Sequence, residues 1–519
     1  MLHMKAVIIT VLICFISLSV SADVKLPSII GRNMVLQRDV EVPIWGKASP
    51  KEVVIVMMNG QRLTTQSSEE GDWMVYLVPM PAGGPYSMTI VARNRIELTN
   101  IVIGEVWVGS GQSNMQLPVR NSANAGDEIA NADYPSIRLF TVKRAMSDNR
   151  LEDCEGEWVE CNPNTIRNFS AVTYFFGRDL HEGKRIPVGL IQSSWGGTTA
   201  EAWTSKEFLS SSRDFEPILE RYAEALKNID EAKSRYDEAL SQWKKEAQKN
   251  EKEGKEIVRK PIPPLGLGHP HTPFVIFNGM IAPIIPYAIR GVLWYQGESN
   301  ARRAFQYRSL FPTMIDSWRY SWNQGPFPFL FVQLPNYDVP LAYYGEIKKI
   351  PGASTWAELR EAQLMTLSVR NTGMAVTIDI GDAENIHPIN KQDVGHRLFL
   401  VARAVAYRED VAFSGPIFRT MRIVGGKARI HFEQATNGLV AKGGELIGFS
   451  IAGNDRKFVA AKATIEGSIV VVWSPEVSNP VAVRYAWADN PKCNLFSKDS
   501  FPASPFRTDI WPGITHDAK

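Results

Sequence analysis

Short apolar runs separated by turn residues characterise the chain from residue 23 to about residue 100. The runs are rich in β-branched and aromatic residues, and turn dipeptides such as Asn59-Gly60 lie between them. They fall at residues 40–45, 53–58, 73–78 and 86–92. Strands of this length and spacing are typical of a small β-sandwich. The pattern therefore predicts an N-terminal β domain over residues 23–100.

A different pattern begins at Ile101. Longer apolar runs follow one another along the chain, and polar or helical stretches separate them. They fall at residues 101–108, 186–191, 289–295, 327–334 and 373–378. Buried strands that alternate with helices indicate a parallel sheet with helices packed on it. We therefore predict an α/β domain over residues 101–408.

Two regions depart from this alternation. Residues 206–256 are dense in Glu, Lys, Arg and Ala, and their apolar residues recur at helical spacing. This predicts a long helix or helical hairpin inserted into the α/β domain, and its charged face is typical of a solvated structural insertion. After residue 408 short apolar runs return, with Gly425-Gly426 and Gly443-Gly444 as turns. They predict a second β domain over residues 409–519.

The first 22 residues have the pattern of a secretion signal. Lys5 precedes an apolar run over residues 6–20, and Val20-Ser21-Ala22 then offers a cleavage site before Asp23. The run is short for a membrane-spanning helix, and no later run is long and apolar enough to span a bilayer. We therefore expect a signal peptide over residues 1–22 and a secreted or periplasmic mature protein without an integral membrane segment.

Charge and cysteine content argue against several classes of function. The net charge is +2, and neither a basic stripe nor a Gly-rich phosphate loop is present, so nucleic acids and nucleotides are not expected partners. Cys154, Cys161 and Cys493 follow the predicted cleavage site. An oxidising compartment would allow Cys154 and Cys161 to close a short disulfide loop. Three cysteines without a CxxC pair do not predict a zinc site.

A serine lies just after the first strand of the predicted α/β sheet. This serine turn, residues 111–115, carries Ser113 after Gly111 and Gln112. A nucleophilic serine needs such a turn because its hydroxyl must project from the sheet edge, where small neighbours let a carbonyl approach. Ligands of open α/β sheets bind at the carboxyl ends of strands. The segment is not a Gly-x-Ser-x-Gly elbow, and by itself it also fits an ordinary turn.

Two further segments after predicted strands carry candidate oxyanion donors. The glycine turn, residues 195–199, contains Gly196, whose backbone N–H is suited to face a developing oxyanion. The amide loop, residues 296–300, contains Gln296 and Asn300. Amide side chains are costly to bury without partners. These two therefore either donate to an oxyanion or are satisfied structural residues.

A histidine with acidic neighbours lies in a fourth segment. The histidine loop, residues 379–388, contains Asp382, Glu384 and His387. A carboxylate three residues before a histidine is placed to orient the imidazole while the ring still faces a nucleophile. Lone histidines are more often structural, so the argument depends on the conjunction of all four segments.

Together the four segments resemble those of the SGNH hydrolases, in the order serine, glycine, amide and acid-x-x-histidine. The amino-acid sequences of these segments are similar to those of carbohydrate acetylesterases with a sialate O-acetylesterase-type domain. The matching segments are Gly111-Gln112-Ser113-Asn114-Met115, Phe277-Asn278-Gly279-Met280-Ile281-Ala282-Pro283, Trp294-Tyr295-Gln296-Gly297-Glu298-Ser299-Asn300-Ala301, and Ile386-His387-Pro388 followed by Lys391, Val394-Gly395 and Arg397-Leu398. The resemblance extends from about Leu26 to the C-terminal strands.

The resemblance implies an α/β fold with an SGNH-hydrolase-like parallel sheet flanked by N- and C-terminal all-β domains. It also implies a serine esterase that removes O-acetyl groups from carbohydrate without a metal or an organic cofactor. In such an enzyme Ser113 would attack the acetyl carbonyl and His387 would accept its proton. The backbone N–H groups of Ser113 and Gly196, with a side-chain amide from Gln296 or Asn300, would hold the oxyanion.

The third member of the triad stays open, because the chain departs here from the usual SGNH pattern. The residue three before His387 is Glu384 rather than Asp, and the amide loop reads Gln-Gly-Glu in place of Gly-x-Asn-Asp. We predict Glu384 as the orienting acid. Asp382, Glu298 or a backbone carbonyl are the alternatives.

Acetylated sialic acid is the first expected substrate, and acetylated xylan or another plant glycan is the second. A sialate carboxylate favours bidentate pairing with arginine, and Arg120, Arg302 and Arg303 lie near the four segments. Surface salt bridges explain these arginines equally well. The alternative from another class is a glycan-binding protein without catalysis, and the presence of both Ser113 and His387 argues against it.

Overall fold

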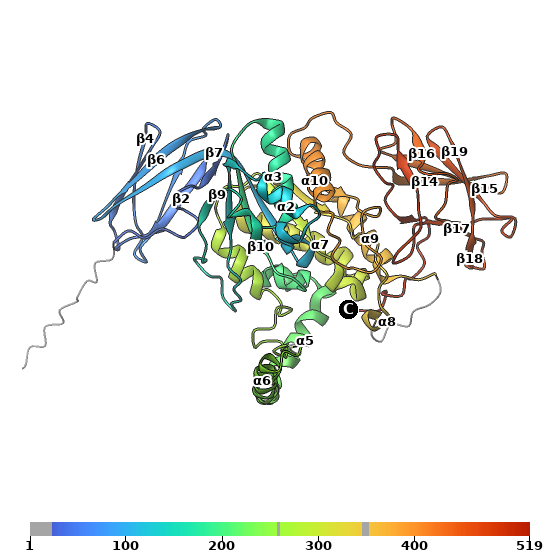
Figure 1. Cartoon of the computed structure of the whole chain (residues 1–519), viewed down its shortest axis with the longest axis horizontal. Helices are drawn as coiled ribbons and strands as arrows, with labels where there is room; N and C mark the ends of the chain where they lie inside the picture. The colour runs from blue at the N-terminus through green and yellow to red at the C-terminus, as the bar shows by residue number, and fades with distance from the viewer. Residues whose placement is uncertain (1–22, 257–259, 345–351) are drawn as a thin grey trace, which may run out of the picture.

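The computed structural model of the chain describes residues 23–256, 260–344 and 352–519. The predicted signal peptide, residues 1–22, lies outside the described residues. Figure 1 shows an N-terminal β part, a central α/β part and a C-terminal β part that follow one another along the long axis of the molecule. This is the fold class that the sequence predicts.

The N-terminal part consists of short strands in two sheets. They are β1 (Val35–Gln37), β2 (Val42–Lys47), β3 (Val53–Met58), β4 (Gln61–Gln66), β5 (Asp72–Leu77) and β6 (Gly83–Val91). β2 pairs with β5, and β3 pairs with both β4 and β6. The sequence pattern misses β4, because this strand is half exposed and its residues are mostly polar.

One long strand, β7 (Arg95–Gly111), belongs to two parts of the molecule. Its first half pairs antiparallel with β6, and its second half pairs parallel with the neighbouring strands of the α/β part. The boundary at residue 100 that the sequence suggests therefore falls inside a continuous strand. In its middle the fully buried carboxylate of Glu105 pairs with Arg38 at 2.5 Å and with Arg290 at 2.7 Å.

The central sheet has the strand order β13-β12-β11-β7-β10-β8-β9. The added strands are β8 (Tyr134–Thr141), β9 (Trp158–Cys161), β10 (Val188–Ser194), β11 (Gly291–Tyr295), β12 (Phe329–Val332) and β13 (Thr372–Ala375). All neighbours are parallel except β8 and β9. The register places Ser194 and Tyr295 beside Gly111, so the carboxyl ends of β10, β7 and β11 lie side by side.

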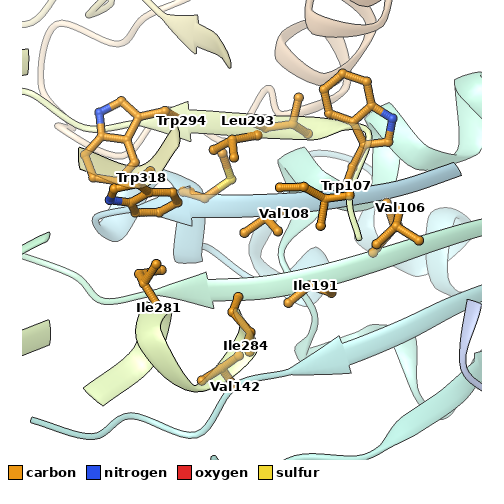
Figure 2. Close-up of a cluster of buried hydrophobic side chains, with 14 of the residues drawn as sticks. Val106, Trp107, Val108, Val142, Ile191, Ile281, Ile284, Leu293, Trp294 and Trp318 are labelled. Carbon is orange, nitrogen blue, oxygen red and sulfur yellow. The ribbon is translucent and has the colours of Figure 1, made fainter. Parts of the chain in front are cut away.

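Helices cover both faces of this sheet. The helices of the central part are α1 (Ser113–Gln116), α2 (Ala125–Ala130), α3 (Ala171–Lys184), α7 (Ala304–Trp322), α8 (Leu341–Tyr344), α9 (Thr355–Met365) and α10 (Gln392–Val405). Trp107 on β7 packs against Phe176 of α3, and Trp294 on β11 packs against Trp318 of α7. Trp107 is paired with Gly291 of β11, so these two positions face the same side of the sheet. Side chains alternate along a strand, and Trp294 lies three residues after Gly291, so it points to the opposite face. Figure 2 shows this buried cluster around β7, β10 and β11.

The predicted insertion is helical. It contains α4 (Lys206–Leu209), α5 (Glu216–Lys227) and α6 (Ile229–Lys252). Figure 1 shows α6 projecting from the body of the molecule, and none of its residues is fully buried. In the part of the chain that the structure describes, no helix has the length and apolarity needed to cross a membrane.

The C-terminal part consists of antiparallel strands around a core of its own. They are β14 (Ile417–Val424), β15 (Lys427–Glu433), β16 (Leu439–Ala441), β17 (Phe449–Ala452), β18 (Phe458–Ala460), β19 (Lys462–Glu466), β20 (Ile469–Trp473), β21 (Ala482–Tyr485), β22 (Leu495–Ser497) and β23 (Phe506–Arg507). The fully buried guanidinium of Arg360 on α9 joins the two parts, because it donates to the carbonyls of Ala488 and Asp489 as well as to two carbonyls of its own part.

The suggested disulfide between Cys154 and Cys161 is not formed. Both side chains are buried free thiols, and Cys493 is also free. Burial raises the pKa of the Cys154 thiol and of the Cys161 thiol to about 12. Cys154 and Cys161 therefore act as small apolar residues of the core.

Candidate active site

The serine turn, the glycine turn and the amide loop meet because their strands end together. Gly111, the last residue of β7, has φ +132°, and a Cβ added to it would lie 2.2 Å from the carbonyl oxygen of Tyr295. Only glycine allows this close approach and this left-handed conformation. The chain can therefore turn sharply here and begin α1 at Ser113, beside the end of β11.

Ser113 and His387 are in hydrogen-bond contact. The distance between Ser113 Oγ and His387 Nε2 is 2.8 Å, although the two residues are 274 positions apart in the sequence. Both line a hollow of about 620 Å³. Burial, and then the nearby Lys391 cation, lower the pKa of His387 below its ordinary value of 6.5. The imidazole is therefore neutral at neutral pH and able to accept a proton from the serine hydroxyl.

The histidine loop is held by its own side chains. Asp382 Oδ1 accepts the backbone N–H groups of Glu384 and Asn385, and Asn385 Oδ1 accepts the N–H of His387. The side chains of Asp382 and Glu384 are exposed to solvent. Across the described ranges no carboxylate is hydrogen-bonded to the imidazole of His387. The one hydrogen-bond partner of this ring among these residues is the hydroxyl of Ser113. The contact between Glu384 and His387 that the sequence suggests is therefore absent from this geometry.

Replacement of Glu384 with Gln is expected to lower kcat/KM by less than about a hundredfold. The exposed carboxylate acts on His387 only through a field that solvent and salt screen. Steady-state kinetics of acetate release measure this effect, and Asp382→Asn is the matched variant because its side-chain oxygen can still accept the two N–H groups. A loss of a thousandfold or more in Glu384→Gln would mean that this carboxylate orients the imidazole during turnover.

Gln296 and Asn300 face one another inside the wall of the hollow rather than its interior. Gln296 Nε2 donates to Asn300 Oδ1 at 2.6 Å, and its Oε1 accepts from Tyr307 at 2.9 Å. Asn300 Nδ2 donates to Glu201 at 2.9 Å. Both amides are buried, and neither lines the hollow. Of the two interpretations that the sequence left open, this geometry favours satisfied structural residues over oxyanion donors.

Gly196 lies beside the serine. A Cβ added to Gly196 would lie 3.2 Å from the Cβ of Ser113. The backbone N–H of Gly196 donates to Gln116 Oε1 at 2.7 Å, so the side chain of Gln116 occupies this donor. The structure thus brings Ser113, Gly196 and His387 together in the wall of the hollow.

Behind the serine, Asn114, Glu298 and Lys391 form a buried polar cluster that the sequence did not predict. Asn114 Nδ2 donates to Glu298 Oε1 at 2.7 Å, and Lys391 Nζ donates to Asn114 Oδ1 at 2.7 Å. Burial raises the pKa of Glu298, against the opposing effect of the Asn114 hydrogen bond. Burial lowers the pKa of Lys391 to about 7, and the charge of Glu298 opposes this shift. Glu298, one of the alternative acids, therefore contacts Asn114 and not His387.

Two of the three candidate arginines line the hollow. Arg303 is held there by an ion pair with the buried carboxylate of Glu201. Arg302 is exposed, and its Nε donates to the carbonyl of Tyr343. Arg120 lies outside this hollow. The described residues contain no group of three or more His, Cys, Asp or Glu side chains placed to hold a metal ion.

This chain is similar to known proteins over most of its length. The family model of carbohydrate esterases described as sialic acid-specific acetylesterase matches residues 278–399, which include the amide and histidine loops. Sialate O-acetylesterase from Mus musculus is 30% identical, over 97% of this chain and 97% of that protein. The protein of the same name from Homo sapiens is 29% identical, over 97% and 96%.

A solved structure agrees with these relatives. A carbohydrate acetylesterase from Xanthomonas citri is 35% identical to this chain and superimposes on it with a TM-score of 0.80. The match covers 94% of this chain and 100% of that one, so it includes both flanking β parts. Sequence and fold thus agree over nearly the whole chain, which belongs to the sialate O-acetylesterase family of carbohydrate esterases.

Proposed function

We propose that this esterase cleaves O-acetyl groups from sugars through a covalent acetyl-serine intermediate. The observation that supports the proposal is the 2.8 Å contact between Ser113 Oγ and His387 Nε2 in the wall of a hollow of about 620 Å³. As Oγ bonds to the acetyl carbon, its proton passes to Nε2. The imidazolium then gives this proton to the sugar oxygen as the ester bond breaks, and the sugar leaves as an alcohol.

Water completes the proposed cycle. A water molecule gives a proton to His387 and attacks the acetyl-serine, which releases acetate and restores the Ser113 hydroxyl. In both halves the developing oxyanion would face the backbone N–H groups of Ser113 and Gly196. Because Gln116 occupies the Gly196 donor in the free site, the acetyl oxygen would displace that side chain.

The proposed substrate is acetylated sialic acid. The names of the mammalian relatives support it, and so does the position of Arg302 on the hollow. An exposed guanidinium there is suited to pair with the sialate carboxylate, whereas neutral glycans carry no such group. We also propose that the protein is exported, because the expected signal segment precedes residue 23.

Acetate release from a panel of acetylated sialic acids and acetylated xylan tests the substrate. We expect the higher kcat/KM for a sialic acid, and we expect Arg302→Gln to lower that value about tenfold, the effect of losing one charge-assisted hydrogen bond. The same variant should leave xylan turnover unchanged, because xylan has no carboxylate to pair.

Arg120→Gln is the matched control for this experiment, since Arg120 lies outside the hollow and should affect neither substrate. A preference for xylan, or an equal loss on both substrates in Arg302→Gln, would reject the sialate proposal. It would leave the serine mechanism intact, because that mechanism does not depend on the sugar.

A further inference from the structure

The side chain of Asn114 joins three segments that meet at the active site. It follows Ser113 in α1 and is fully buried. Its Nδ2 donates to Glu298 Oε1 at 2.7 Å and to the backbone carbonyl of Ile386 at 2.9 Å, and its Oδ1 accepts from Lys391 at 2.7 Å. Ile386 immediately precedes His387. One amide therefore connects the serine turn to the amide loop and to the backbone beside the histidine.

These partners permit only one orientation of the amide. In this orientation the carbonyl oxygen of Asn114 faces Lys391 and accepts a hydrogen bond from it. A carboxylate and a backbone carbonyl only accept, so Glu298 and Ile386 require the NH₂ group. Both N–H groups and one of the two lone pairs of the Asn114 amide are thereby used. Rotation of the amide by 180° would break all three bonds of a buried side chain, which is costly.

Given the proposed function, in which Ser113 and His387 form the catalytic pair, we propose that Asn114 is a positioning residue for His387 and that Lys391 locks it in place. The Asn114 amide holds the carbonyl of Ile386 and so fixes the backbone immediately before His387 against α1. This connection supplies the alignment that a carboxylate on the imidazole provides in a triad. The hydrogen bonds of Asn114 thus take the place of that carboxylate in holding the imidazole in position.

Lys391 also acts on the imidazole through its charge. Its Nζ is buried, lies 5.2 Å from the centre of the Tyr295 ring, and contributes to the lowered pKa of His387. Removal of this cation should raise the pKa of His387. The other titratable or charged side chains that line the hollow with His387 are Glu298, His271, Arg302, Arg303 and Tyr343, and those of its own loop are Asp379, Asp382 and Glu384.

Asn114→Ala tests the geometric part. We expect kcat for acetate release to fall about a hundredfold, since a displacement of about 1 Å between reacting groups costs that much, while KM stays within a fewfold of the wild-type value. A loss of fold would lower the amount of active protein, so active sites are counted by fluorophosphonate titration of Ser113. An unchanged kcat per titrated site would overturn the proposal.

Lys391→Met and Lys391→Gln separate position from charge. Both remove the cation, so the acid limb of the pH profile of kcat/KM should move to higher pH by at least about half a unit in both variants. Gln can still donate to Asn114, so its kcat should exceed that of the Met variant. Lys245→Met, which removes a positive charge from the exposed helix α6, is the control that should not move the limb. An acid limb that stays in place in both Lys391 variants would overturn the charge role.

Comparison of Ser113→Ala with Asn114→Ala distinguishes failure of the proposed serine mechanism from failure of the proposed positioning role of Asn114. Full activity in Ser113→Ala would reject the proposed mechanism itself. An inactive Ser113→Ala together with wild-type kcat in Asn114→Ala would leave the mechanism standing and reject only the positioning role.

Discussion

Replacement of Ser113 with Ala is expected to lower kcat for acetate release by a thousandfold or more while the protein stays folded. The variant loses the oxygen that would form the acetyl-serine bond, and the remaining groups of the site retain only the part of catalysis that comes from binding and oxyanion contacts. A small half-buried hydroxyl on a four-residue helix contributes little to the core, so the free energy of unfolding should change little.

The measurement combines kinetics on an acetylated sugar with fluorophosphonate labelling followed by peptide mass analysis. Ser110 offers a matched control, because it lies three residues upstream on β7 and its buried hydroxyl has no hydrogen-bond partner in the described part of the chain. Ser110→Ala should keep both turnover and labelling. A label on any serine other than Ser113, or near-normal turnover in Ser113→Ala, would remove this residue from the mechanism.

Replacement of His387 with Ala is expected to produce a loss of the same order, a thousandfold or more. Without the imidazole, the proton of Ser113 Oγ has no acceptor, and the leaving sugar oxygen has no donor. Because the two residues act as a unit, the Ser113→Ala/His387→Ala double variant should be no slower than either single variant. Fluorophosphonate labelling should also slow in His387→Ala, because the serine is no longer activated.

His396→Ala is the control for this variant. His396 lies nine residues further on, in α10, and its Nδ1 pairs with Asp179 at the surface at 2.7 Å. It should retain wild-type turnover. Strictly additive losses in the double variant would contradict the assignment, since independent residues would not share one proton transfer.

The positions of the four active-site segments could be predicted because they depend on strand ends. Apolar runs of buried strands are visible in the sequence, and parallel strands deliver the residues that follow them to one edge of the sheet. Ser113 and Gly196 meet for this reason, although they are 83 positions apart in the sequence.

The role of individual polar side chains could not be read in the same way. Gln296 and Asn300 are satisfied by Tyr307 and Glu201, and no spacing in the sequence identifies such partners. Glu384 has the spacing of an orienting acid, but the turn capped by Asp382 leaves its side chain in solvent. Sequence spacing gives proximity along the chain, whereas the direction of a side chain depends on the local turn.

The buried cluster behind the serine was missed for a related reason. Lys391 and Asn114 are polar residues in polar segments, where exposure is the ordinary expectation. Their burial follows from long-range contacts. Lys391 packs against Asn114 of α1, and Asn114 packs against Glu298 of the amide loop. The available signal was the presence of Lys391 in a segment that resembles the family, four residues after His387.

The continuous strand β7 limits how this protein can be recombined. Many flanking β domains are joined by linkers, which allows them to be exchanged between proteins as units. Here a junction at residue 100 would cut one hydrogen-bonded ladder in two, and it would also separate Glu105 from Arg38. The N-terminal β part can thus be exchanged only together with β7, the strand that ends at the serine turn. The extended connection between α10 and β14, residues 408–416, is the place where a relative's domain could be joined with the sheet left whole.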